Sequence, residues 1–363
     1  MANVTTTTQV DGPVDVRFQQ RLLRRAKPLC PYFLGANPGD VMPSHSGTFT
    51  IKWRRFTNLT PTTTALTAVN GTFANPTRTP GSILAVTDTT AVLSKYGDFV
   101  VLNEEVDLKN YTGQAGEVVD LIAQQAGQSL NRLQRNTLED SSTIVRPGLA
   151  TSDTAGAGVV DPITVPLIQY VINQLDRENA RKFTPGSEGS QNVGTSPILP
   201  GYCGICHSDV AVDIAKLPGF KSVETYAGQV QTKEGEFGLL MVAGTAVRFV
   251  MTSESSIDAN SGGTPGGNIR VTASGTTADL YNTVIYGQDF HGAVSLDVSL
   301  IKEIYTAGDR IPGIQLISHG RGSGGIADPL NDVSTMGWKA WHTSAILNSA
   351  WGFCVRTAAS KLV

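Results

Sequence analysis

Hydrophobic and polar positions alternate in two segments of the first hundred residues. In the first segment, Phe49, Ile51, Trp53 and Arg55 share one parity, and threonine, lysine and arginine fill the other. A second alternating run covers residues 91–102, and a stretch rich in Thr, Pro, Asn and Gly connects the two. A period of two predicts β-strands, so we predict a long two-stranded ribbon with an irregular tip. Two strands alone are marginal in water, and the ribbon therefore needs a surface to lie on, in this chain or in a neighbour.

Two later segments have the period of an α-helix. Between Gly113 and Asn136 the apolar stripe consists of Val118 or Val119, Ile122, Ala126, Leu130 and Leu133. This spacing predicts an amphipathic helix of about 24 residues, about 36 Å long. A second stripe, formed by Leu167, Val171 and Leu175, follows Asp161-Pro162. We expect this second helix to end around Arg181–Lys182, because cations suit a helix C-terminus.

The rest of the chain reads as a mixture of strands, short helices and loops. Residues 1–46 are dense in proline, which predicts an extended arm with one short helix at 18–26. Residues 201–207 predict a buried strand, and Ser208-Asp209 would cap a short helix that ends before Pro218. Further strand-like runs lie at 237–251, 280–286, 311–318 and 337–356. The fold class is therefore α+β.

The charge balance argues against a nucleic-acid-binding protein. Lys and Arg number 28 against 31 Asp and Glu, for a net charge of −3, whereas non-specific binding to nucleic acid requires many cations that release counterions from phosphate. Residues 1–60 are locally basic, with Arg17, Arg21, Arg24, Arg25, Lys27, Lys52, Arg54 and Arg55 against Asp11, Asp15 and Asp40. This segment is either a basic mobile arm or an arm that pairs with acidic patches on neighbouring subunits.

The ends and the hydropathy of the chain indicate no membrane association. Residues 1–15 lack the basic and apolar regions of a signal peptide, and no run approaches the 18 or more apolar residues of a membrane span. We therefore expect a protein made in a cytosol, without a membrane partner.

The motif Cys203-Gly204-Ile205-Cys206-His207 has the C-x-x-C-H spacing of covalent haem attachment and could be half of a zinc site. No second ligand pair lies nearby in the sequence, although a zinc site needs four ligands. We interpret the motif as a buried strand in which cysteine acts as a small hydrophobe. No phosphate-binding loop, dinucleotide fingerprint or H-E-x-x-H motif is present. We expect no catalytic residues, no metal and no cofactor.

Several short segments resemble the major capsid proteins of tailed bacteriophages, in particular the family typified by the N4-like podoviruses. The similar segments are Lys95–Asp98, Pro200–Tyr202 with His207–Val210, Gly235–Gly238, Val247–Val250, Val284–Asp289, Asp328–Leu330, Gly337–Ala340 and Ile346–Asn348. These segments occur in the same order and with similar spacing in the family, and together they cover roughly residues 47–106 and 160–363. The family often has proline where this chain has Ser208, and residues 1–46 match no quoted family segment.

The resemblance implies the HK97-like capsid fold, named for coliphage Hong Kong 97. In that fold the ribbon is the extended loop (E-loop) and the long helix is the spine of the peripheral domain. The implied divisions are an N-terminal arm at 1–46, the E-loop at 47–106, the peripheral domain at 107–158, the axial domain at 159–333 and a C-terminal strand returning to the peripheral domain at 334–363.

The resemblance also implies a function. A major capsid protein assembles into hexamers and pentamers of an icosahedral shell around double-stranded DNA, without sequence-specific binding, in the host cytoplasm. Portal protein, and in some phages scaffolding and decoration proteins, would be partners. Some members crosslink through a ribbon lysine, but residues 60–85 contain no lysine, so we expect no crosslinking. Arg54 and Arg55 are candidate intersubunit contacts, because exposed arginines suit carboxylate pairing. The alternatives are a tail-tube or adhesin subunit and an encapsulin-like shell protein.

Overall fold

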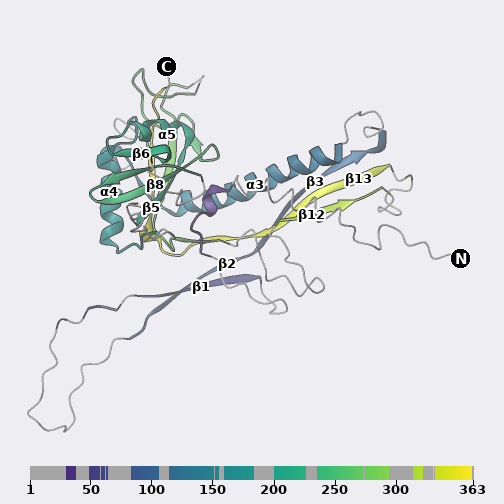
Figure 1. Ribbon diagram of the computed structural model, residues 1–363, viewed down its shortest axis with the longest axis horizontal. Coiled ribbons are helices and arrows are strands. Elements are labelled where there is room, and N and C mark those ends of the chain that lie inside the picture. Colours follow the sequence, from purple (N-terminus) through teal and green to yellow (C-terminus); the bar gives the residue numbers. More distant parts are fainter. Residues whose placement is uncertain are drawn as a thin grey trace, which may run out of the picture.

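The protein is described from a computed structural model in which an α/β body, a long helix with its own small sheet, and a two-stranded ribbon follow one another in space (Figure 1). The structure describes residues 30–37, 49–57, 59–61, 63, 83–105, 114–150, 152–154, 159–183, 200–225, 235–272, 275–293, 314–321, 330 and 332–361. The predicted helix at 18–26, most of the ribbon tip and the locally basic residues 17–27 lie outside these ranges.

An eight-stranded sheet forms the centre of the body. Its strands, in spatial order, are β4 (Thr143–Val145), β15 (Gly352–Thr357), β10 (Leu280–Tyr286), β5 (Gly201–His207), β8 (Thr245–Thr252), β7 (Glu236–Val242) and β6 (Phe220–Ser222), and β9 (Ile257–Asp258) pairs with β10. The β5–β8 and β15–β4 pairs are parallel and the others antiparallel. Strands β5 and β10 are buried along their whole length, which explains their nearly continuous apolar sequences.

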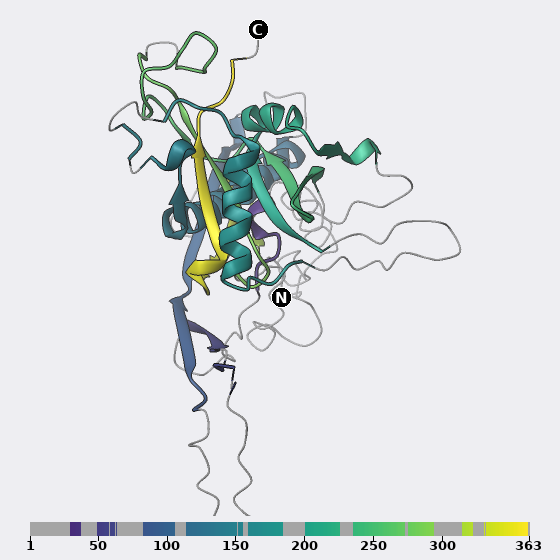
Figure 2. The same cartoon turned by 90° about the vertical axis from the view of Figure 1, so that its left-hand side faces the viewer.

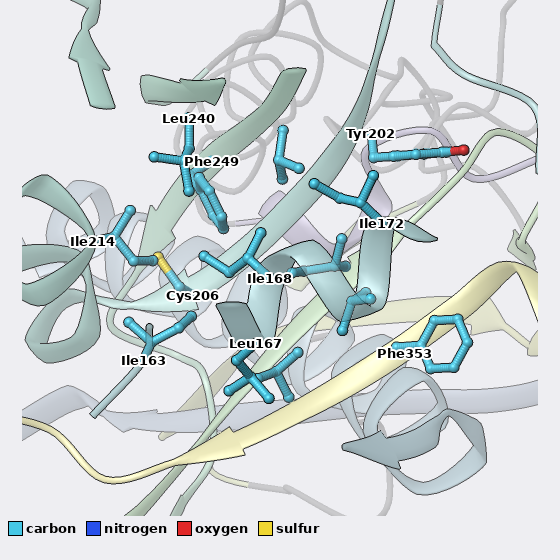
Figure 3. Close-up of a cluster of buried hydrophobic side chains, with 14 of the residues drawn as sticks. Ile163, Leu167, Ile168, Ile172, Tyr202, Cys206, Ile214, Leu240, Phe249 and Phe353 are labelled. Atoms are coloured by element: carbon cyan, nitrogen blue, oxygen red, sulfur yellow. The ribbon is translucent and has the colours of Figure 1, made fainter. Parts of the chain in front are cut away.

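Two helices cover one face of this sheet. They are α4 (Val165–Arg177) and α5 (Ser208–Ala215), and Figure 2 shows α4 lying against the strands. Figure 3 shows Ile168 of α4 beside Cys206 and Phe249 of the sheet, and Ile172 beside Tyr202. The predicted end of this helix at Arg181–Lys182 was wrong, because Asn179 takes a left-handed conformation (φ 52°) two residues after Arg177.

The long helix, α3, runs from Gln114 to Ser141. Its 28 residues correspond to about 42 Å, and the stripe predicted from the sequence is its buried face. The predicted end at Asn136 was five residues too early. Helix α3 continues because Leu138 is buried against the second face of the eight-stranded sheet, in a cluster with Cys203 and Val284. The polar pair Asn136-Thr137 conceals this buried turn in the sequence.

A three-stranded sheet packs along the first half of α3. Its order is β12 (Ile314–His319), β13 (Val333–His342), β3 (Ser94–Asn103). Trp338 and Ala340 of β13 and Ile314 of β12 meet the buried stripe of α3. The remaining strands, β11 (His291–Ala293) and β14 (Ser344–Ile346), pair with each other near the junction of helix, ribbon and body. Single-turn 3-10 helices are η2 (Pro31–Phe33), η3 (Pro147–Leu149), η4 (Val223–Thr225) and η7 (Ser349–Trp351).

The ribbon consists of β1 (Thr50–Phe56) and β2 (Val86–Val92), which pair antiparallel from Thr50↔Val92 to Phe56↔Val86. The predicted second strand, 91–102, was wrong as a single element. Only its beginning belongs to the ribbon, and after Leu93 the chain becomes β3 and pairs with β13 instead. Ala91, Val92 and Leu93 are consecutive apolar residues, and no glycine or proline lies beside them, so the sequence gives no sign of the change of partner. Figures 1 and 2 show the ribbon projecting away from the body.

Candidate functional site

The ribbon is attached to the rest of the molecule by one small apolar cluster. Ile51 and Trp53 of β1 are buried against Ala91, Leu93, Ala345 and Leu347. The Trp53 indole Nε1 donates a hydrogen bond to the carbonyl oxygen of Asn37 at 3.3 Å. A Cβ atom at Gly292 would lie 2.6 Å from the indole ring, so the close approach of β11 requires glycine there. The alternation seen in the sequence therefore marks the face by which the ribbon is held.

The opposite face of the ribbon is exposed and carries both charged and apolar groups. The Arg54 guanidinium donates to both carboxylate oxygens of Asp88, at 2.9 and 3.2 Å, and Lys52 Nζ lies 2.6 Å from the same carboxylate. Hydrogen bonds from Arg54 and then Lys52 lower the pKa of Asp88 to about 2. Two cations share one anion, so this face keeps one net positive charge. Exposed apolar side chains on the same face surround it, namely Phe56, Val86 and Val92.

The two predicted contact residues, Arg54 and Arg55, lie on different faces of β1. Arg54 is exposed and bound to Asp88. Arg55 shares the inward parity of Ile51 and Trp53 and is partly buried, and its Nε has no hydrogen-bond partner in the described part of the chain. The structure thus places the two guanidinium groups on opposite faces of the ribbon, as the alternation along this segment predicts.

The Cys203–His207 motif lies on β5 in the middle of the eight-stranded sheet. Its two cysteines are three residues apart on a strand, so their side chains point to opposite faces. Cys203 belongs to the cluster that contains Leu138 of α3, whereas Cys206 belongs to the cluster under α4 and α5. Burial raises the pKa of the Cys206 thiol. The two sulfur atoms therefore cannot bind one metal ion or one haem.

His207 ends β5 and begins α5. Its Nδ1 accepts a hydrogen bond from the backbone N–H of Asp209 at 3.0 Å, so His207 is the N-cap. The prediction that Ser208-Asp209 caps the helix was wrong, because Ser208 is already its first residue. An accepting Nδ1 requires a neutral ring, and burial lowers the pKa of His207 accordingly. The Asp209 carboxylate instead accepts from Tyr281 Oη at 3.1 Å and from Arg270.

A buried carboxylate joins α3 to Tyr32 of η2 and to the body. Glu139 Oε1 accepts from the Tyr32 hydroxyl at 3.3 Å, and its other oxygen accepts from the hydroxyl of Ser256 and from Asn282 Nδ2 at 3.5 Å. Burial raises the pKa of Glu139 in spite of these donors and of Arg135. The Glu139 side chain thus connects α3 with Tyr32 and with two segments of the body, at Ser256 and at Asn282. Glu139 falls in the part of α3 that lies beyond its predicted end.

His342, the last residue of β13, is expected to make the stability of the folded protein depend on pH. It is buried between the rings of Phe33 and Tyr96, with centroids at 5.5 and 6.4 Å, and burial lowers its pKa to about 4. A pKa below the unfolded value of 6.5 means that its contribution is complete above pH 6.5 and is lost as the pH falls towards 4. We expect a loss of up to about 3 kcal/mol of unfolding free energy.

Thermal unfolding of the wild type and of His342→Phe at pH 7 and pH 4.5 checks this expectation. Phenylalanine keeps the ring contacts and removes the titration, so the variant should lose less stability on acidification. Glu139 acts in the opposite sense, since its raised pKa makes protonation favour the folded state. His207 also resists protonation, so the variant should reduce the acid effect without abolishing it. Equal losses in both proteins would contradict the assignment to His342.

Other sources of chemistry are limited in the described residues. No group of three or more His, Cys, Asp and Glu side chains there could hold a metal ion. Among the described helices, none combines the length and the hydropathy needed to cross a membrane. The features that remain are surfaces: the ribbon face and the edge of the three-stranded sheet, which suit contacts between proteins.

Comparison with known proteins identifies the fold. No family model matches the sequence, and no curated protein is similar to it. Among solved structures, the chain is similar to a protein in "Capsid of Ralstonia phage GP4", with a TM-score of 0.55 and 8% identity over 88% of this chain and 86% of that chain. It is also similar to one in "Cyanophage Pam1 capsid asymmetric unit", with a TM-score of 0.51 and 12% identity over 88% and 87%. The predicted α+β, HK97-like fold is confirmed by these likenesses.

Proposed function

We propose that this chain is the major capsid protein of a tailed bacteriophage, a structural subunit without enzymatic activity that assembles with copies of itself into the hexamers and pentamers of an icosahedral shell. The observation that carries the proposal is the shared fold, which covers 88% of this chain and 86–87% of the two capsid chains. Membership of the N4-like group is part of the proposal and rests on the segments quoted from the sequence.

The ribbon supports self-association on physical grounds. Among the described residues of β1, Ile51 and Trp53 are the two side chains buried on its inner face. Its outer face presents apolar groups around a net positive charge. Exposed apolar surface of this kind marks contacts with other proteins. We infer that a neighbouring subunit covers the outer face. A β-built tail-tube or adhesin subunit, the alternative from the sequence, would not need the 28-residue helix on which the three-stranded sheet packs.

The net charge of −3 fits a shell that encloses DNA without binding its sequence. The proposal places the protein in the virion after assembly in the host cytoplasm, with a portal protein as a partner and scaffolding or decoration proteins as further candidates. The E-loop at 47–106 and the other divisions at 1–46, 107–158, 159–333 and 334–363 belong to the same proposal. In the described residues, segment 334–363 contributes β13 to the sheet on α3 and β15 to the eight-stranded sheet.

Mass spectrometry of purified virions tests this assignment. The proposal requires the chain to be among the most abundant virion proteins and to be encoded beside portal and terminase genes. An encapsulin-like shell protein, which would have the same fold, would instead occur in a cellular genome without those neighbours. The proposal would be contradicted if this chain were absent from purified virions of the phage whose genome encodes it.

Arg54 and Arg55 are proposed intersubunit contacts on opposite faces of β1. Reversing both charges, Arg54→Glu with Arg55→Glu, should reduce the yield of assembled particles strongly, because repulsion from Asp88 adds to the lost contacts. The double variant Lys216→Glu with Lys221→Glu changes the net charge equally at exposed positions of the body and serves as the control. Density-gradient sedimentation measures the yield. Normal assembly of the arginine variant would remove both residues from the proposed interface.

A further inference from the structure

Strand β3 has an open hydrogen-bonding edge. It pairs with β13 on one side and, within the residues that the structure describes, with no strand on the other. The Phe99 N–H donates to the side chain of Asp98 at 2.8 Å, so this amide points away from β13. Because bonding direction alternates along an antiparallel strand, Gly97, Val101 and Asn103 also direct their backbone groups outward. Four residues are thus positioned to bind another strand.

Apolar side chains flank this edge on both faces of the sheet. Phe99 and Val101, on the face away from α3, are 67% and 53% exposed, and Val100, on the face towards α3, is 39% exposed. Leu121 of α3 is 67% exposed, and Gln125, one turn further along, contacts Asp98 at 2.6 Å. Natural proteins protect open edges with lysine, proline or bulges. The segment from Phe99 to Leu102 has none of these, which indicates that another strand covers it.

We infer that β3 pairs with β3 of a second copy of this chain, antiparallel, across a two-fold axis through Val100. This inference rests on the proposed function, which supplies the neighbouring copy. The charges of the strand support the choice of occupant. Lys95 lies five residues before Val100 and Glu105 lies five residues after it. Strand β3 ends at Asn103, and Glu104 and Glu105 begin the helical turn that follows it. An antiparallel copy centred on Val100 therefore brings Lys95, near the start of each strand, towards the acidic residues that follow the end of the partner subunit's strand, and the charges of the two copies are complementary.

This register also provides hydrogen-bond partners for the backbone groups on the open edge of β3. Residues whose numbers add to 200 oppose each other, so Phe99 faces Val101 of the partner subunit and both direct backbone groups into the seam. Val100 faces Val100 of the partner subunit as a non-hydrogen-bonded pair, in which the side chains are closest. A two-fold axis perpendicular to the sheet keeps both α3 helices on one face. The two copies of Leu121 would then cover the central valine pair.

A single cysteine tests this seam. In Val100→Cys the two thiols would belong to a non-hydrogen-bonded pair with Cα atoms about 4.5 Å apart, which is within the range of a disulfide. The native cysteines Cys30, Cys203, Cys206 and Cys354 are buried and free, so background crosslinking should be low. Ser318→Cys, exposed on β12 at the other edge of the same sheet, is the matched control. Assembled particles of each variant are oxidised gently and separated on a non-reducing denaturing gel.

We expect Val100→Cys particles to give a dimer band that a reductant removes, and Ser318→Cys particles to give none. A two-fold contact can produce dimers only. Particles that stay monomeric on the gel, that crosslink equally in both variants or that form larger species would overturn the β3 seam and leave the proposed function standing. Failure of the wild type to form any particle would instead count against the proposed function.

A charge exchange keeps the seam testable if Val100→Cys does not assemble. Lys95→Glu and Glu105→Lys should each lower the yield of particles, because each places like charges together at both ends of the seam. The double variant restores opposite charges and should recover the wild-type yield. Loss of assembly in the double variant equal to the combined losses of the single variants would overturn the proposed register.

Discussion

Trp53→Ala is expected to abolish particle formation while the body of the protein remains folded. Trp53 and Ile51 are the two buried side chains of β1 among the described residues, and removal of a buried tryptophan costs about 3–5 kcal/mol. A two-stranded ribbon has little stability of its own, so a loss of this size should detach β1 and β2 from the junction. A detached ribbon cannot present its outer face to a neighbour in a fixed position.

The body should not respond to this substitution, because the apolar clusters on the eight-stranded sheet contain no ribbon residue. Circular dichroism and the main thermal transition should therefore stay close to those of the wild type, and electron microscopy should show no shells. Trp53→Phe, which keeps much of the buried ring, is the matched control and should still assemble. Normal shells from Trp53→Ala would show that the anchor is dispensable for assembly.

Arg248→Met is expected to destabilise the body by about 3–5 kcal/mol, since it leaves the carboxylate of Glu236 buried without its cation. Arg248 Nη1 donates to Glu236 Oε1 at 2.9 Å, and the two side chains are 4% and 0% exposed. The pair lies between β7 and β8, next to a register shift at Glu236/Gly238. Desolvation of both charges is already compensated in the native state, so the damage comes from removing one partner.

The double variant Arg248→Met with Glu236→Leu should recover most of this loss, because it replaces the ion pair with apolar groups of similar size. Urea unfolding at pH 7 measures the free energies of the wild type, the single variant and the double variant. If the double variant were as unstable as Arg248→Met, the pair would contribute specific contacts that packing cannot replace, and the expectation would be wrong.

The sequence predicts those elements whose periodicity matches their burial. Ile122, Ala126 and Leu130 mark the buried stripe of α3, and Ile51 and Trp53 mark the held face of the ribbon, because one side of each element is covered. Errors occur where long-range packing decides the outcome. Helix α3 extends to Ser141 because Leu138 finds a partner on a sheet formed by residues far away in sequence.

The local sequence pattern also could not predict which strands pair with each other. No glycine or proline separates the two strands on either side of Leu93, yet β2 pairs with β1 and β3 pairs with β13, which lies more than two hundred residues later. The strand-like run at 237–251 divides into β7 and β8 because Ala243 and Gly244 both take positive φ angles, 49° and 81°. This is the two-residue turn typical of hairpins, and the alanine in it hides the usual signal.

The candidate surfaces were only partly predictable. Arg54 and Arg55 could be chosen from the sequence as exposed cations, but the Asp88 partner of Arg54 depends on the ribbon register. The open edge of β3 could not be recognised at all before its pairing with β13 was known. The relation between Lys95 and Glu105 likewise follows only from the edge position of the strand.

Negative-stain electron microscopy of the protein, expressed alone and together with the products of neighbouring genes, tests the central claim most directly. The proposed function predicts closed shells of uniform diameter, or hexamers and pentamers free in solution, in at least one of these preparations. Monomers or tubes under every condition would contradict it and would favour a tail protein.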